Sequence, residues 1–133
     1  MKIQIHITIQ SDDGQVQDHQ QIACLQRGAL SPEELGMNLA EAKELLHSVQ
    51  ETMVRQQAAE YVRRQSCCAH CGTTQSQKGS HQIVCRTLFG KLQVASPRLH
   101  HCRCQATAKR SFSPLAELLP ERTAPELLYL QNS

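Results

Sequence analysis

Residues 67–72 read Cys-Cys-Ala-His-Cys-Gly and residues 102–104 read Cys-Arg-Cys, and these two stretches decide the expected fold. The first suits a tight turn, in which Gly72 takes a left-handed conformation and backbone N–H groups point at the sulfurs. In an extended strand residues i and i+2 lie on the same face, so Cys102 and Cys104 can present both sulfurs to one ion. Thirty residues separate the pairs, which is room for a β-hairpin. The layout is typical of a zinc ribbon.

The two pairs together supply four candidate metal ligands, Cys68, Cys71, Cys102 and Cys104. An all-sulfur tetrahedron favours zinc, with iron as the lesser alternative. Disulfides in a secreted domain are a second interpretation, but the N-terminus alternates like a strand and has no apolar signal core. Buried free thiols without metal are a third. We expect a zinc site.

The remaining cysteines and the nearby histidines are assigned lesser roles. Cys67 is next to a ligand, and adjacent residues rarely face one ion, while Cys24 and Cys85 lie in strand-like runs far from both pairs. All three are expected to be small core or surface residues. Four histidines are possible substitutes if one cysteine is not a ligand, although each is more often a solvated side chain: His70, His81, His100 and His101.

Charge is strongly segregated along the chain, although the net charge is only +2. Residues 1–60 carry four basic and nine acidic side chains, whereas residues 61–112 carry nine basic and no acidic ones. A basic block that coincides with a cysteine framework favours nucleic-acid binding over an ordinary solvated surface. The residues expected to contact double-stranded DNA are Arg86, Lys91, Arg98, Arg103, Lys109 and Arg110.

Length and composition limit the class of protein. The chain has 133 residues, two Phe, two Tyr and no Trp, so an aliphatic and modest core is expected, for which a metal would matter. No apolar run approaches the roughly 18 residues of a membrane span. We expect a cytoplasmic protein without a membrane partner.

Local patterns predict an α+β fold: an N-terminal β-hairpin and a long helix, then a zinc-ribbon-like β domain and short C-terminal helices. Ile3 to Ile9 alternate like a strand, Ser11 to Gly14 form a turn, and Gln15 to Gln26 return. Ser31-Pro32 begins a short helix that Gly36 ends. Three domains are expected. Residues 1–64 are structural or serve oligomerisation, residues 65–110 form the basic metal domain, and residues 111–133 form a truncated linker.

The long helix is predicted from Asn38 to about Arg64, where neither Gly nor Pro occurs. Its apolar seam either packs within the chain or pairs with a second copy: Leu39, Ala42, Leu46, Val49 and Met53. Beyond the helix, strands are expected at His81–Leu88 and Lys91–Ala95, with Pro97 marking the exit and Arg98–Cys104 forming the next strand. One helix is expected to begin at Ser113 and to end at Pro120, and another is expected to begin at Thr123.

An ordered series of segments over roughly residues 30–131 resembles the N-terminal part of bacterial insertion-sequence transposases of the ISKra group. The segments are Gly36-Met37-Asn38-Leu39-Ala40-Glu41-Ala42-Lys43, Cys68-Ala69-His70-Cys71-Gly72, Lys78-Gly79-Ser80-His81, Arg86-Thr87-Leu88-Phe89-Gly90, Ser96-Pro97-Arg98, Cys102-Arg103-Cys104, Phe112-Ser113-Pro114-Leu115 and Pro125-Glu126-Leu127-Leu128-Tyr129-Leu130. The resemblance implies a DNA-binding front end with a zinc ribbon, in which Cys68, Cys71, Cys102 and Cys104 match the family's paired cysteines.

The same resemblance implies a catalytic region of RNase H-like type after the last helix, but the sequence closes at Ser133. Two-metal strand transfer needs converging carboxylates, and the only aspartates are Asp12, Asp13 and Asp18 around one turn. We therefore expect a truncated transposase without enzymatic activity that binds transposon ends. The alternative is a regulatory fragment that docks on an intact transposase, and a homodimer is a further possibility.

Overall fold

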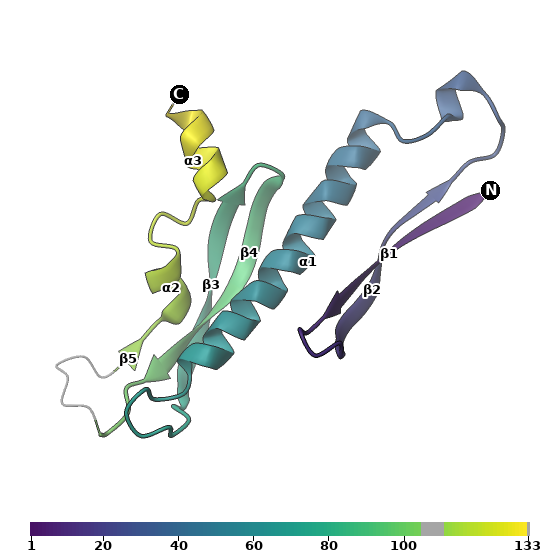
Figure 1. Cartoon of the computed structure of the whole chain (residues 1–133). Helices are drawn as coiled ribbons and strands as arrows, with labels where there is room; N and C mark the ends of the chain where they lie inside the picture. Colours follow the sequence, from purple (N-terminus) through teal and green to yellow (C-terminus); the bar gives the residue numbers. More distant parts are fainter. Residues whose placement is uncertain (105–110, 133) are drawn as a thin grey trace. The chain divides into compact units, whose positions relative to one another are not determined.

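In the computed structural model, which describes residues 1–104 and 111–132, the chain is a mixed α+β protein (Figure 1). It forms two compact units, Met1–Gln50 and Glu51–Ser133. The expected order of an N-terminal hairpin, a long helix, a β-sheet region with clustered cysteines and short C-terminal helices is confirmed. None of the described helices is long and apolar enough to cross a bilayer.

The first unit begins with an antiparallel hairpin of β1 (Lys2–Gln10) and β2 (Val16–Gln26). Ile3 lies opposite Leu25 and Ile5 opposite Ala23, so the apolar side chains share one face, as the alternation predicts. The turn closes at Gly14, whose φ of 87° favours glycine. Two register shifts, at Ile5/His6 and Ile9/Gln10, interrupt the ladder.

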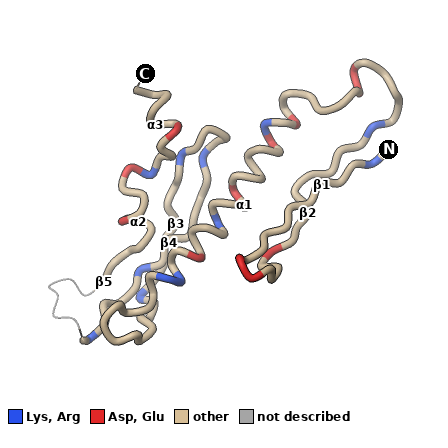
Figure 2. The backbone as a smooth tube through the Cα atoms, in the orientation of Figure 1, with Lys and Arg blue, Asp and Glu red and all other residues tan. Residues whose placement is uncertain are grey.

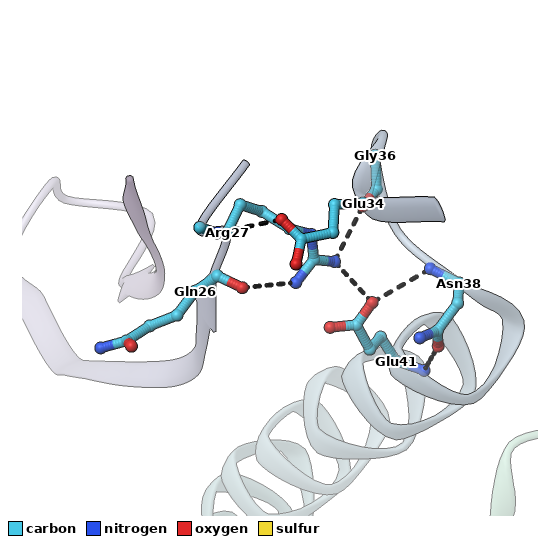
Figure 3. Close-up of polar contacts among 7 residues, drawn as sticks. Gln26, Arg27, Glu34, Gly36, Asn38 and Glu41 are labelled. Carbon is cyan, nitrogen blue, oxygen red and sulfur yellow. Dashed lines mark hydrogen bonds and ion pairs between the residues drawn. The ribbon is translucent and has the colours of Figure 1, made fainter. Parts of the chain in front are cut away.

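A polar network joins the hairpin to helix α1 (Leu39–Gln65) through the one-turn 3-10 helix η1 (Pro32–Glu34) (Figure 3). The Arg27 guanidinium donates to the Gly36 carbonyl oxygen at 2.8 Å and to the Glu41 carboxylate at 2.6 Å. That carboxylate also accepts from the Asn38 backbone N–H at 3.0 Å, and Asn38 Oδ1 accepts from the Glu41 N–H at 2.8 Å. This reciprocal capping box begins α1, and Arg27 lowers the pKa of Glu41.

Helix α1 runs from residue 39 to 65, within a residue of the predicted limits. Leu39, Leu46 and Met53 of the expected seam are exposed, so self-association through it remains a prediction. The border between the two units falls inside α1 rather than at residue 64, because Val54, Ala58, Tyr61 and Val62 pack on the core of the second unit.

The second unit is built on a three-stranded sheet of order β3-β4-β5. Its strands are β3 (Gln77–Thr87), β4 (Gly90–His100) and β5 (Ser111–Phe112). Ile83 pairs with Val94 and Cys85 with Leu92, so four buried side chains lie on one face. Ala58 of α1 and Leu115 of α2 (Pro114–Leu118) complete this core, and α3 (Pro125–Gln131) contacts β3.

The expectation that Pro97 ends a strand is wrong, because β4 continues to His100. Among the described residues, β5 pairs with Leu99 and His100 alone, so no ladder partner is described for Pro97 on the edge of β4 away from β3. Proline lacks an N–H donor and is tolerated where a strand edge needs none. The expected separate strand from Arg98 to Cys104 is therefore absent, and residues 98–100 belong to β4.

Candidate metal centre

The first cysteine pair lies in the loop between α1 and β3, where the chain makes the expected tight turn. The Gly72 N–H donates to the Cys68 carbonyl oxygen at 2.9 Å, and the Cys68 N–H donates to the Thr73 carbonyl oxygen at 2.9 Å. Gly72 has a φ of 74°, as predicted from the sequence. A Cβ there would meet no atom within 4 Å, so the backbone conformation, rather than space, favours glycine.

Backbone pairing anchors this loop at both ends. The Gln75 N–H donates to the Ser66 carbonyl oxygen at 2.7 Å, and Cys67 forms a bridge with Thr74. The Ser66 N–H donates to the Val62 carbonyl oxygen, so Ser66 continues the last turn of α1. The loop therefore closes on itself at the start of β3, which fixes Cys68 and Cys71 beside the sheet.

The second pair follows the end of β4, and its geometry differs from the expected extended strand. His100 makes the last ladder contacts, pairing with Ser111 and donating its N–H to the Ser76 carbonyl oxygen at 2.9 Å. No strand partner is described beyond it, and the chain turns at Arg103 and Cys104. The turn, rather than a shared strand face, therefore brings Cys102 and Cys104 toward the first pair.

The four sulfurs converge on one point. Cys68 Sγ lies 3.4 Å from Cys104 Sγ, and Cys71 Sγ lies 3.3 Å from Cys102 Sγ. All four sulfur atoms lie within 4.8 Å of one another. Zn–S bonds of about 2.3 Å in a tetrahedron place the sulfurs roughly 3.8 Å apart, so the donor set fits such an ion. The cluster can hold a metal ion.

Local donors favour the thiolate form that metal binding requires. Backbone N–H groups of Cys71 and His70 lower the pKa of Cys68. Cys71 Sγ lies 3.2 Å from Thr73 Oγ1, and the Thr73 hydroxyl and backbone N–H lower the pKa of Cys71 to about 6. The neighbouring thiols raise the pKa of Cys104. The pKa values of such a cluster belong to the group rather than to single thiols, and a bound cation would favour the loss of all four protons.

The other cysteines and histidines stay outside the cluster. Cys85 is buried in the core, which raises its pKa, while Cys24 and Cys67 are exposed, as expected of bystanders. No histidine belongs to the group of potential ligands that the described residues form. His101 instead packs on Phe112, with ring centroids 4.7 Å apart.

The residues expected to contact DNA fall into two groups at opposite ends of the β3–β4 hairpin. Arg86 pairs with Lys91 next to the turn, whereas Arg98 lies opposite Gly79 at the other end. Lys91 and Arg98 are seven residues apart on one strand, a span of roughly 23 Å. Arg103 belongs to the second group, beside the cysteines. Lys109 and Arg110 lie outside the described residues.

Two of these arginines also have structural contacts. Arg86 Nε donates to Thr123 Oγ1 at 3.2 Å. The Arg86 backbone N–H donates to the Arg122 carbonyl oxygen and its carbonyl oxygen accepts from the Ala124 N–H, which attaches the segment before α3 to β3. Arg98 donates to Ser111 Oγ at 3.1 Å. Arg86 therefore has a structural role at the turn end of the hairpin that its position in a basic block does not reveal.

The sequence-based set omitted basic residues that the fold brings to the cysteine end of the hairpin. Arg63 and Arg64 end α1, and the Ser66–Gln75 bond joins this helix end to the start of β3, where Lys78 lies. Glu60 accepts from both arginines, which lower its pKa to about 2. Figure 2 shows basic residues at both ends of β3 and β4. Arg63, Arg64 and Lys78 all lie in the basic block of residues 61–112, and that was the signal available in the sequence.

No protein-family model, curated protein or solved structure matches the chain. The relationship to transposases therefore remains a prediction from the sequence motifs.

Proposed function

We propose that the chain is a zinc-stabilised, DNA-binding module of the transposase type, without catalytic activity of its own. The observation that carries the proposal is the placement of the four-sulfur cluster at one end of a β-hairpin within a segment that has nine basic and no acidic residues. The excess of positive side chains attracts phosphates, and a four-thiolate site is typical of structural zinc.

Zinc would have a structural role in this proposal. Cys68 and Cys71 come from the loop before β3, and Cys102 and Cys104 come from the turn after β4. A metal held by both pairs would tie the start of β3 to the end of β4 and fix the neighbouring Arg98 and Arg103. Those side chains would then meet the DNA backbone without first being ordered, which reduces the entropic cost of binding.

The phosphate contacts predict a strong dependence of DNA affinity on salt. If about four to six phosphates are neutralised, the slope of log K against log salt for duplex DNA should be on the order of −4 to −5. Replacing Arg98 and Arg103 together by alanine should make the slope shallower by about two units. Fluorescence anisotropy with a labelled duplex, repeated over a range of salt concentrations, measures both quantities.

The matched control is the pair Lys2→Ala and Lys43→Ala, which removes two exposed cations from the first unit. This double variant should bind with the wild-type slope. Absence of binding at low salt by a folded, metal-loaded protein would contradict the proposal. Equal slopes for the two double variants would contradict the assignment of Arg98 and Arg103.

A further inference from the structure

The segment between β2 and α1, residues 28–38, displays large apolar side chains to solvent, and we call it the apolar loop. Leu30 is 95% exposed, Leu35 is 71% exposed, and Met37 in the same loop is also exposed. Scattered exposed apolar residues need no explanation, whereas large ones gathered in one place mark interaction sites. In Figure 1 the apolar loop projects beyond the start of α1 and the open end of the β1–β2 hairpin.

Polar contacts hold the apolar loop in one conformation. The Glu34 carboxylate accepts from the backbone N–H groups of Gly28 at 3.0 Å and Ala29 at 2.8 Å, which closes the first half of the loop. The Arg27 guanidinium, bonded to the Gly36 carbonyl oxygen, ties the second half to the end of β2 (Figure 3). Because the loop is already ordered, a partner need not fix its backbone on binding, which lowers the entropic cost of association.

An apolar groove of about 480 Å³ lies in the second unit, between α1 and the β3–β4 hairpin. Three polar side chains, Arg55, Gln82 and Gln93, contribute to its lining, so the lining includes one cation and no carboxylate. The rest of the lining is apolar and mostly small, which leaves space for larger side chains of a partner: Ala58, Ala59, Val62, Val94, Ala95 and Pro97. We call this the apolar groove.

Charge favours a second copy of this chain as the partner of the apolar loop. Residues 28–42 contain three glutamates and neither Lys nor Arg, so an anionic membrane or a nucleic acid would be repelled. Residues 1–50 carry three basic and seven acidic side chains, whereas residues 51–133 carry eleven basic and five acidic ones. The second unit of another copy therefore offers both an apolar groove and the opposite charge.

We propose that the apolar loop of one copy docks in the apolar groove of a second copy. Leu30 and Leu35 enter the groove, and the exposed Glu33 between them faces Arg55. The ion pair of Arg55 with Glu51 is exposed and weak, so its remaining N–H donors can meet a second carboxylate. The contact joins different surfaces of the two copies, and it does not depend on DNA binding.

Sedimentation velocity of the metal-loaded protein without DNA tests the inference first. A contact of this small size predicts a dissociation constant on the order of 10–100 µM, so the average mass should rise over that range of chain concentration. A monomer at every concentration up to about ten times that range would overturn the inference.

Two variants test the two surfaces separately. Leu30→Ser with Leu35→Ser removes the apolar tips of the loop, and Ala59→Glu fills the groove and repels the acidic loop. All three positions are exposed, so the fold is retained, and each variant should raise the dissociation constant roughly 10-fold or more. The matched controls are Val16→Ser, an exposed apolar residue of the first unit, and Gln57→Glu, an exposed position of α1 outside the groove. Both controls should associate like the wild type.

An equimolar mixture of the loop variant and the groove variant gives the decisive result. The loop variant keeps an intact groove and the groove variant keeps an intact loop, so the mixture should form a dimer and no larger species, although each variant alone is monomeric. A mixture that stays monomeric would overturn the inference. Association of the groove variant alone at wild-type strength would also overturn it, because the loop would then contact another surface, such as the loop of the second copy.

Discussion

Cys71→Ser and Cys104→Ser are each expected to release the metal and to disorder the segment from residue 66 to 104. Each thiolate belongs to a pair with sulfurs 3.3 or 3.4 Å apart, so either substitution leaves three sulfur ligands. Structural zinc contributes apparent binding free energies of about 10–16 kcal/mol in small domains, which is comparable to the whole stability of a domain. Thermal unfolding and metal content of the purified variants measure the effect.

Two other cysteines of the same chain provide matched controls. Cys67 is adjacent to a ligand but exposed, and Cys24 is exposed in the first unit. Serine at either position should retain the metal and change the free energy of unfolding by no more than about 0.5 kcal/mol. Equal losses across all four variants would show that the cysteines are packed side chains without a metal.

Leu115→Ala is expected to cost about 2–5 kcal/mol of unfolding free energy, the second largest effect of a single substitution that we predict. The Leu115 side chain is 0% exposed and packs in the cluster with Ile83 and Leu92, so truncation leaves a cavity in the core of the second unit. This core is aliphatic and small, which leaves few neighbours to fill the space. Denaturant unfolding of the metal-loaded protein measures the loss.

Leu118 lies on the same short helix and is 46% exposed, so Leu118→Ala is the matched control. It makes the same chemical change on the same helix and should cost less than about 1 kcal/mol. A similar loss for both variants would mean that α2 is not docked on the sheet through Leu115. A loss confined to Leu115 would support the packing of α2 against β3 and β4.

The features that the sequence predicted well are those set by short-range patterns. The alternation of Ile3 to Ile9 predicts β1, the absence of Gly and Pro from residue 38 to about residue 64 predicts α1, and the Cys-x-x-Cys-Gly turn predicts the conformation of Gly72. The four sulfurs were also correctly grouped, because the cysteine spacings restrict which residues can approach one another.

The features that were missed depend on contacts between distant segments. Strand β4 passes Pro97 because the described part of β5 pairs with the last two residues of β4 and leaves the edge at Pro97 without a ladder partner, which no local pattern reports. The turn at Arg103 and Cys104 likewise follows the end of the β4 ladder, beyond the reach of local sequence patterns. The split of the basic residues between two ends follows from hairpin register, which the residue counts do not contain.

Native mass spectrometry of the purified wild-type protein tests the central claim most directly. The account predicts the mass of the chain with all seven cysteines reduced, plus one zinc ion and minus the thiol protons that the ion displaces. A chelator should remove that ion together with the ordered structure of residues 66–104. A metal-free chain that remains folded, or a mass that shows disulfides between the two cysteine pairs, would contradict it.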